Sequence, residues 1–126
     1  MKALPQLMFQ RDLGEVVALW TQAFPDMTVT ELAAKGEPRR VSVNPAGQEL
    51  ILFHSPVSHQ FDFTPSISIV VSCERADEVD HLAGVLGDGG KTFMPLDSYP
   101  FSPRFTWIAD RFGVSWQLMQ QPEGQG

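Results

Sequence analysis

Residues 89–118 read GGKTFMPLDSYPFSPRFTWIADRFGVSWQL and decide the fold expected for this chain. They hold three short strand patterns, at 92–96, 105–109 and 114–119, separated by turns rich in glycine and proline. Before them, residues 66–73 alternate as a strand, and residues 76–86 have a helical apolar period that Gly87 is placed to end. The second half of the chain is therefore predicted to follow the order β-α-β-β-β.

The first half has the same predicted order. Asp12 offers an oxygen that can cap a helix, Glu15 stands where a capping-box carboxylate belongs, and Pro25 ends the helix. Strand patterns lie before and after this helix, at about 4–10, 28–34, 40–44 and 49–54. Residues 55–65 contain two prolines and no helical period, so they are expected to connect two modules.

The two halves also match at particular positions. Glu15-Val16 with Leu19 corresponds to Glu78-Val79 with Leu82, a shift of 78 − 15 = 63. Residues 47–52 correspond to residues 113–118, a shift of 113 − 47 = 66, and a loop insertion explains the difference of three. Two matches at nearly one offset, in one element order, indicate an internal repeat.

Composition and net charge argue against several classes of function. The 126 residues are 43% hydrophobic, enough for the core of one domain spanning 1–126. A formal charge of −6 argues against nucleic acid and anionic membrane surfaces, which reward clustered lysine and arginine. The single cysteine, Cys73, excludes an internal disulfide, and no apolar run approaches the ~20 residues that span a bilayer. A soluble, cytoplasmic protein without a signal peptide is expected.

Eight segments, which together extend over nearly the whole chain, carry a family resemblance: 7–10, 19–20, 23–26, 61–68, 78–82, 89–90, 94–101 and 105–119. On these segments the chain resembles the vicinal-oxygen-chelate superfamily of glyoxalases, bleomycin-resistance proteins and extradiol dioxygenases. Within it, the chain is similar to the PhnB-like branch, whose domain is often labelled 3-demethylubiquinone-9 3-methyltransferase.

This resemblance implies an α+β fold in which two βαβββ modules, about 4–54 and 66–119, form a glyoxalase-like cup with the helices outside. Residues 55–65 would be the linker and 120–126 a polar tail. Members commonly pair, so a homodimer is expected. Metal-dependent relatives take their ligands from the first and last strands of each module. The corresponding positions here hold Pro5 or Leu7, Ser66, Gln117, and either Glu49 or His54. Serine and glutamine are poor ligands for divalent ions, so neither a metal nor another cofactor is expected.

Six residues are candidates for contact with a ligand in the cup. Their chemistry is neutral or aromatic, apart from one histidine, and this suits a small, partly apolar organic molecule. They are His54, Ser66, Ser68, Phe105, Trp107 and Gln117. Cys73 shares a strand face with Ile69 and Val71 and is interpreted as an inert buried thiol.

Three functional hypotheses follow. The preferred one is a metal-free protein that binds a small organic molecule in the cup. The alternative is an enzyme of the lyase or isomerase type, with or without a metal, acting through Glu49 or His54. The third is a homodimerisation or partner-binding domain whose cup is filled by side chains. Methyl transfer is not expected, because the lone Gly89-Gly90 pair follows a helix instead of opening one and the element order gives no doubly wound parallel sheet.

Overall fold

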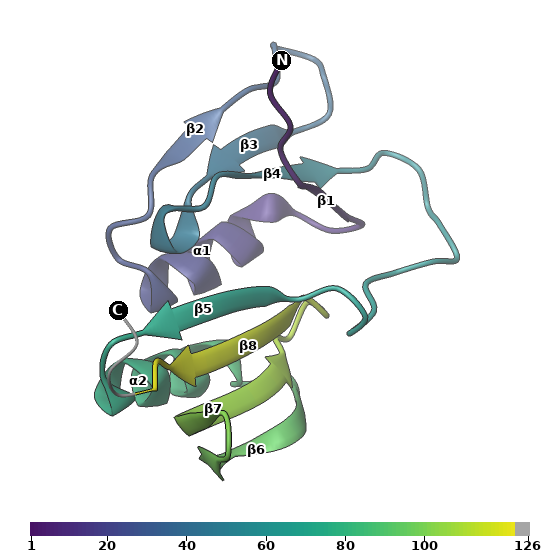
Figure 1. Ribbon diagram of the computed structural model, residues 1–126. Coiled ribbons are helices and arrows are strands. Elements are labelled where there is room, and N and C mark those ends of the chain that lie inside the picture. Colours follow the sequence, from purple (N-terminus) through teal and green to yellow (C-terminus); the bar gives the residue numbers. More distant parts are fainter. Residues whose placement is uncertain (123–126) are drawn as a thin grey trace. The chain divides into compact units, whose positions relative to one another are not determined.

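The computed structural model describes residues 1–122 and divides the chain into two compact units, one of residues 1–61 and one that begins at Asp62 (Figure 1). Each unit is a four-stranded sheet with one long helix, and each is described by itself. No helix within residues 1–122 is long and apolar enough to cross a membrane. The assignment of 1–126 as a single domain stays a prediction.

The first unit has the order β-α-β-β-β. Its sheet, called sheet one, has the strand order β1-β4-β3-β2, in which β1 and β4 run parallel and the other pairs antiparallel. The elements are β1 (Gln6–Phe9), α1 (Leu13–Ala23), β2 (Val29–Glu31), β3 (Arg40–Val43), a 3₁₀ turn at Pro45–Gly47, and β4 (Leu50–His54).

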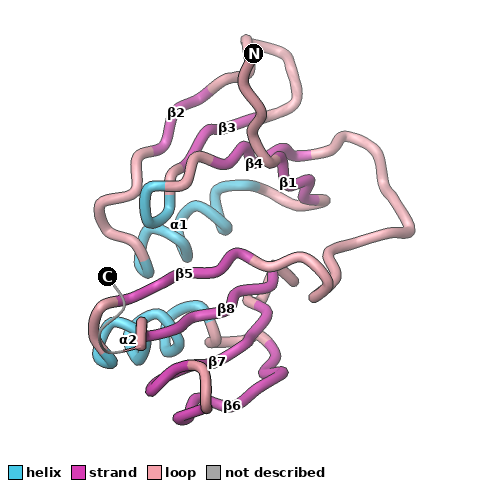
Figure 2. The backbone as a smooth tube through the Cα atoms, in the orientation of Figure 1, coloured by secondary structure: helices cyan, strands magenta, loops and turns pink. Residues whose placement is uncertain are grey.

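The second unit repeats this topology. Its sheet, called sheet two, has the order β5-β8-β7-β6, again with a parallel pair, β5 and β8, beside antiparallel ones. Figure 2 shows the strands and the helix of each unit in the same succession. The elements are β5 (Ile69–Cys73), α2 (Ala76–Leu86), β6 (Lys91–Tyr99), β7 (Ser102–Ala109) and β8 (Ser115–Gln120). The α+β fold of two βαβββ modules is therefore confirmed.

Equivalent positions confirm the internal repeat. The helices are offset by 76 − 13 = 63 residues at their starts and 86 − 23 = 63 at their ends. Val16 and Val79 are both fully buried, as are Leu52 and Leu118. Gly47 and Gly113, each just before the last strand of its unit, have φ of +86° and +93°, a left-handed conformation that favours glycine. The two halves thus share a turn as well as an element order.

Each sheet is covered on one side by its own helix. In the first unit the Phe9 and Trp20 rings meet edge to face at 6.4 Å, which places Phe9 on the side of α1. Its register partners extend this side along β4 and β3, through Leu50, Leu52, Val41 and Val43. All four are at most 2% exposed and form the core.

In the second unit the helix-covered side holds Trp116 and Leu118, both fully buried. Ile108 pairs with Trp116 in the register, and its Cδ1 lies beside Gly87 at the end of α2. Asp110 accepts hydrogen bonds from the Trp116 indole and from the backbone N–H groups of Phe112 and Val114. These three bonds hold the tight turn between β7 and β8.

Several strands differ from the sequence-based ranges. β1 covers only Gln6–Phe9 of the expected 4–10, and β2 only Val29–Glu31 of 28–34. β5 begins at Ile69 instead of residue 66, because Ser66 closes a turn through its hydroxyl contact with Thr64. β6 and β7 run further toward each other, to Tyr99 and from Ser102, with register shifts between paired residues. β6 is an edge strand, so Pro95 fits within it without breaking the ladder.

Candidate functional site

The far face of sheet two is the side turned away from α2, and it carries the polar and aromatic groups of the candidate site. Alternation along β8 puts Trp116 and Leu118 under the helix and Gln117 on the far face. Trp107 of β7 is the register partner of Gln117 and therefore lies beside it. Both side chains are half-buried. The described residues of the far face on β5, β7 and β8 include no charged side chain; they are Val70, Ser72, Phe105, Trp107, Ala109, Ser115, Gln117 and Met119.

A hydrogen-bonded chain fixes the orientation of Trp107. Its indole Nε1–H donates to Ser115 Oγ at 2.9 Å. Ser115 Oγ in turn lies 2.6 Å from Ser68 Oγ. Ser115 is 3% exposed, whereas Trp107 keeps part of its ring accessible, and the ring of Phe93 lies 5.2 Å from it. The Trp107 ring therefore offers an accessible aromatic surface, and its one polar group, the indole N–H, already has Ser115 as its hydrogen-bond acceptor.

Phe105 lies on the same face but in a different environment. It is 3% exposed, and its ring packs edge to face against Tyr99 at 5.5 Å and Phe101 at 4.8 Å. Phe105 therefore supports the β6–β7 hairpin more than it offers a surface to a ligand.

The other two predicted site residues, Ser66 and His54, are not part of sheet two. Ser66 is exposed and sits in the turn with Thr64, before β5 begins. His54 is the register partner of Phe9, so the strand alternation puts it on the helix side of sheet one. Within the second unit the structure thus brings together Ser68, Trp107 and Gln117, with Phe105 on the same face, whereas Ser66 stays in the turn before β5.

Ser115 is the site residue that the candidate set missed. Its position two residues before Gln117 placed it on the same face, but its bond to Trp107 depends on the pairing of β7 with β8. A serine in a strand gives no sequence signal for such a cross-strand bond.

Glu49 lies just before β4, on the far side of sheet one. Lys2 Nζ lies 3.1 Å from its carboxylate, and Ser42 Oγ donates to the other oxygen at 2.9 Å. These two bonds, the one from Lys2 foremost, lower the pKa of Glu49 below its ordinary value. A carboxylate stabilised in its ionised form is a weak general base near neutral pH. An enzymatic role for Glu49 or His54 stays a prediction.

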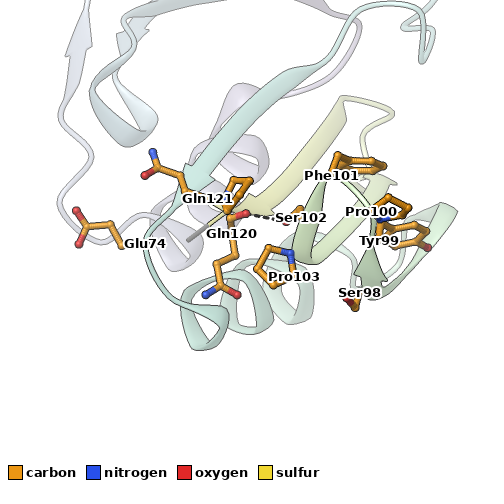
Figure 3. Close-up of a pocket in the computed structure, with 10 residues that line it drawn as sticks. Glu74, Ser98, Tyr99, Pro100, Phe101, Ser102, Pro103, Gln120 and Gln121 are labelled. Atoms are coloured by element: carbon orange, nitrogen blue, oxygen red, sulfur yellow. Dashed lines mark hydrogen bonds between the residues drawn. The ribbon is translucent and has the colours of Figure 1, made fainter. Parts of the chain in front are cut away.

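A concavity of the second unit lies at the end of the β6–β7 hairpin (Figure 3). Its volume is about 720 Å³. Stacked rings of Tyr99 and Phe101, 5.6 Å apart, form one end, and Glu74 lies at the other. Between them lie prolines, serines and the amides of Gln120 and Gln121. None of the six predicted ligand residues lines it, although Phe105 backs its aromatic end.

Comparison with protein families matches residues 1–119 to the family described as 3-demethylubiquinone-9 3-methyltransferase. The chain belongs to this family. A PhnB protein from Bacillus cereus that carries the same family description is 34% identical, with a TM-score of 0.82, and the match covers 95% of this chain and 99% of that one. Comparison with curated proteins finds no match.

Solved structures of lower identity share the fold of this family member. A glyoxylase/bleomycin resistance protein/dioxygenase domain from Frankia is 18% identical, with a TM-score of 0.68, over 99% of this chain and 95% of that one. The fosfomycin resistance protein FosX from Listeria monocytogenes is 14% identical, also with a TM-score of 0.68, over 98% and 93%. Both share the two-module fold. The expected PhnB-like family membership is confirmed by the family match and by the Bacillus cereus protein.

The family description names a methyl transfer that the fold of this PhnB-like chain does not support by itself. Each sheet has one parallel pair, and neither sheet is doubly wound. Gly89 and Gly90 follow α2 and lead into β6, so they do not open a helix. In residues 1–122, no three His, Cys, Asp or Glu side chains are grouped to hold one metal ion.

Other titratable side chains of this family member are held in place by burial, hydrogen bonds or ion pairs. Cys73 is 6% exposed, and burial raises the pKa of its thiol to about 11, so it is protonated at neutral pH. His59 lies 3.0 Å from Ser55 Oγ and stacks on Phe61. Arg104 and Arg111 form the ion pairs expected of surface arginines, with Asp80 and Asp88.

Proposed function

We propose that this protein binds a small, partly apolar organic molecule on the far face of sheet two, and that it does so without a metal ion. The observation that carries the proposal is the pair of Trp107 and Gln117. The indole is held by Ser115 with part of its ring accessible, and an amide lies directly beside it. An accessible ring beside a few fixed polar groups is the usual composition of a small-molecule site.

The polar groups of this face also set the chemistry of the ligand. Ser68 and Gln117 are neutral, and hydroxyl and amide oxygens are weak ligands for divalent ions. FosX, which shares the fold, is described in complex with Mn(II) and 1S,2S-dihydroxypropylphosphonic acid. The proposal for this chain keeps a small organic ligand and omits the metal. Sequestration, without chemical change of the ligand, is the simplest function of such a face.

The test is a screen of neutral aromatic fragments by two-dimensional NMR, with the indole N–H of Trp107 and the side-chain amide of Gln117 as reporters. A true ligand shifts both signals and saturates, and EDTA does not change its affinity. Trp107→Phe and Gln117→Ala each weaken binding by about tenfold, because each removes a contact worth roughly 1–2 kcal/mol. His81→Ala, an exposed change on α2, leaves it unaltered.

Two results would contradict the proposal. If fragments bind but do not shift the Trp107 and Gln117 signals, the binding site lies elsewhere on the protein. Binding that disappears on chelation would replace the metal-free mode with a metal-dependent one.

Homodimerisation and a cytoplasmic location are the further parts of this proposal. They are supported by the superfamily resemblance and by the single, buried cysteine, which fits a reducing compartment. Light scattering after size exclusion measures the mass directly. A mass of about twice 14.0 kDa supports the dimer, and a mass of 14.0 kDa refutes it.

A further inference from the structure

Arg40 lies on the far face of sheet one, the side turned away from α1. Its register partner on β4 is Phe53, whereas the next residue, Val41, pairs with the fully buried Leu52 on the helix side. Met8 of β1 pairs with Phe53 from the other side. Met8, Phe53 and Arg40 therefore form a row across three adjacent strands, and all three are half-buried.

Arg40 differs from the other arginines in the side chain with which its guanidinium interacts. Five of the six have a carboxylate within ion-pair distance: Arg11, Arg39, Arg75, Arg104 and Arg111. Arg40 Nε instead donates to the neutral amide oxygen of Gln6 at 3.1 Å. Within residues 1–122, no carboxylate forms an ion pair with Arg40.

This pairing is unusual for a partly desolvated cation. The chain has a formal charge of −6 and thus an excess of carboxylates, yet none of those within residues 1–122 forms an ion pair with Arg40. Glu49 lies on the same side of the sheet, but Lys2 and Ser42 hold its carboxylate. A half-buried charge without a counter-charge is costly, and an anionic ligand would relieve that cost.

The Gln6 bond also orients the guanidinium. It occupies Nε and leaves the two terminal nitrogens, Nη1 and Nη2, available as a fork of donors. Such a fork matches the two oxygens of a carboxylate or the oxygens of a phosphate. Beside it, Phe53 and Met8 offer apolar surface for the rest of a ligand.

We propose that Arg40 is the anion-binding group of a site for small organic acids on the far face of sheet one. The acid's carboxylate binds Nη1 and Nη2, and its apolar part packs on Phe53 and Met8. This proposal is argued from residues of the first unit alone, so it does not rest on the function proposed for Trp107 and Gln117 in the second unit.

The experiment uses the full chain and three probes: benzoate, acetate and inorganic phosphate, at constant ionic strength. Binding is measured by NMR titration, followed at the Arg40 Nε–H signal in the wild type and at the backbone N–H signals of Met8 and Phe53 in the wild type and every variant. Benzoate is expected to shift this signal saturably and to bind more tightly than acetate, because only benzoate has a ring to pack on Phe53. Arg40→Gln weakens benzoate binding by about tenfold or more, since a charge-assisted pair is lost. Arg40→Lys, which keeps the charge but not the fork, gives an intermediate loss.

Arg39→Gln is the matched control. Arg39 adjoins Arg40 in sequence, but it pairs with Glu31 and Asp12, so its removal changes the net charge equally without removing the proposed site. Benzoate affinity unchanged in Arg39→Gln and lost in Arg40→Gln supports the proposal, provided that circular dichroism shows both variants folded. Equal losses in the two variants, or no saturable benzoate binding to the wild type, overturn it. Binding of phosphate but not benzoate rejects organic acids as the ligand class.

Discussion

At the scale of single residues, one buried hydroxyl organises the far face of sheet two. Ser115 of β8 accepts from the Trp107 indole of β7 and contacts Ser68, just before β5, so one side chain joins three segments of the chain. Removing the Ser115 hydroxyl leaves the Trp107 indole N–H and the Ser68 hydroxyl without this hydrogen-bond partner at a site protected from solvent. Ser115→Ala is therefore expected to lower the free energy of unfolding by about 1–3 kcal/mol, as measured by urea denaturation.

The matched control is Ser72→Ala, on the same face but exposed. It should change stability by less than about 0.5 kcal/mol. Equal effects of the two serine substitutions would show that the Ser115 bonds contribute nothing beyond an ordinary surface serine.

Cys73 gives a prediction in the alkaline range. Its pKa is raised by burial from 9.0 to about 11, so the folded state favours the protonated thiol. The stabilisation is complete below pH 9 and is lost as the pH rises toward 11, because the unfolded chain then gains by ionising first. Urea denaturation between pH 8 and 11 should show a decline that is shallower in Cys73→Ala.

The comparison between wild type and Cys73→Ala isolates the contribution of the thiol, because every other ionisable group is present in both proteins. The alanine variant loses some packing at every pH, so the slope with pH is the measure, not the absolute stability. Identical slopes would mean that the thiol ionises as easily in the folded chain as in the unfolded one.

Residue patterns predicted part of the site and left the rest open. Alternation along β8 was enough to place Ser115 and Gln117 together and Trp116 in the core. It did not decide the face of His54, because Leu50, Ile51 and Leu52 are apolar in succession and give β4 no polar side. The pairing of Trp107 with Gln117 and the missing carboxylate beside Arg40 both depend on contacts between strands, which no local pattern contains.

At the scale of elements, the two helices have equivalent places but different caps. Asp12 caps α1 through its side chain, which accepts from the Gly14 backbone N–H. At the start of α2 the cap residue is Arg75, and Glu78 reaches back to accept from the N–H groups of Glu74 and Arg75. Both arrangements satisfy backbone donors that the first turn leaves unpaired.

Asp12→Ala and Glu78→Ala should each cost about 1 kcal/mol of unfolding free energy, measured by thermal or urea denaturation. Asp26→Ala, an exposed carboxylate after α1, serves as the control for loss of one negative charge. A cost for Asp12→Ala no larger than for Asp26→Ala would mean that solvent replaces the cap.

The elements also show where sequence patterns locate boundaries well. The range 76–86 for α2 is reproduced, because acidic residues in its first turn, an apolar period and Gly87 agree with one another. The hairpin of β6 and β7 is longer than its patterns indicated. Pro95, Pro100 and Pro103 interrupt the local signal there, whereas pairing across the hairpin, with register shifts, extends both strands past two of these prolines.

At the scale of the whole molecule, duplication gives the chain two separate cores. In the second unit, α2 packs on sheet two over Trp116 and Leu118, and Asp110 ties the β7–β8 turn to Trp116. These contacts lie between residues 62 and 122. The repeat in the sequence predicted this organisation because each half carries a complete apolar helix and strand set.

Residues 62–126 alone are therefore expected to fold cooperatively, though with reduced stability, because a unit of about 60 residues buries only about 60% of its surface. A sigmoidal urea transition and a near-ultraviolet circular dichroism signal from buried Trp116 would show this. The control is a fragment of residues 62–113, which lacks β8. Since β8 lies between β5 and β7, its loss leaves β5 without a partner, and this fragment should remain unfolded. If residues 62–126 also give no transition, the second core depends on residues 1–61, and the two modules form one cooperative unit.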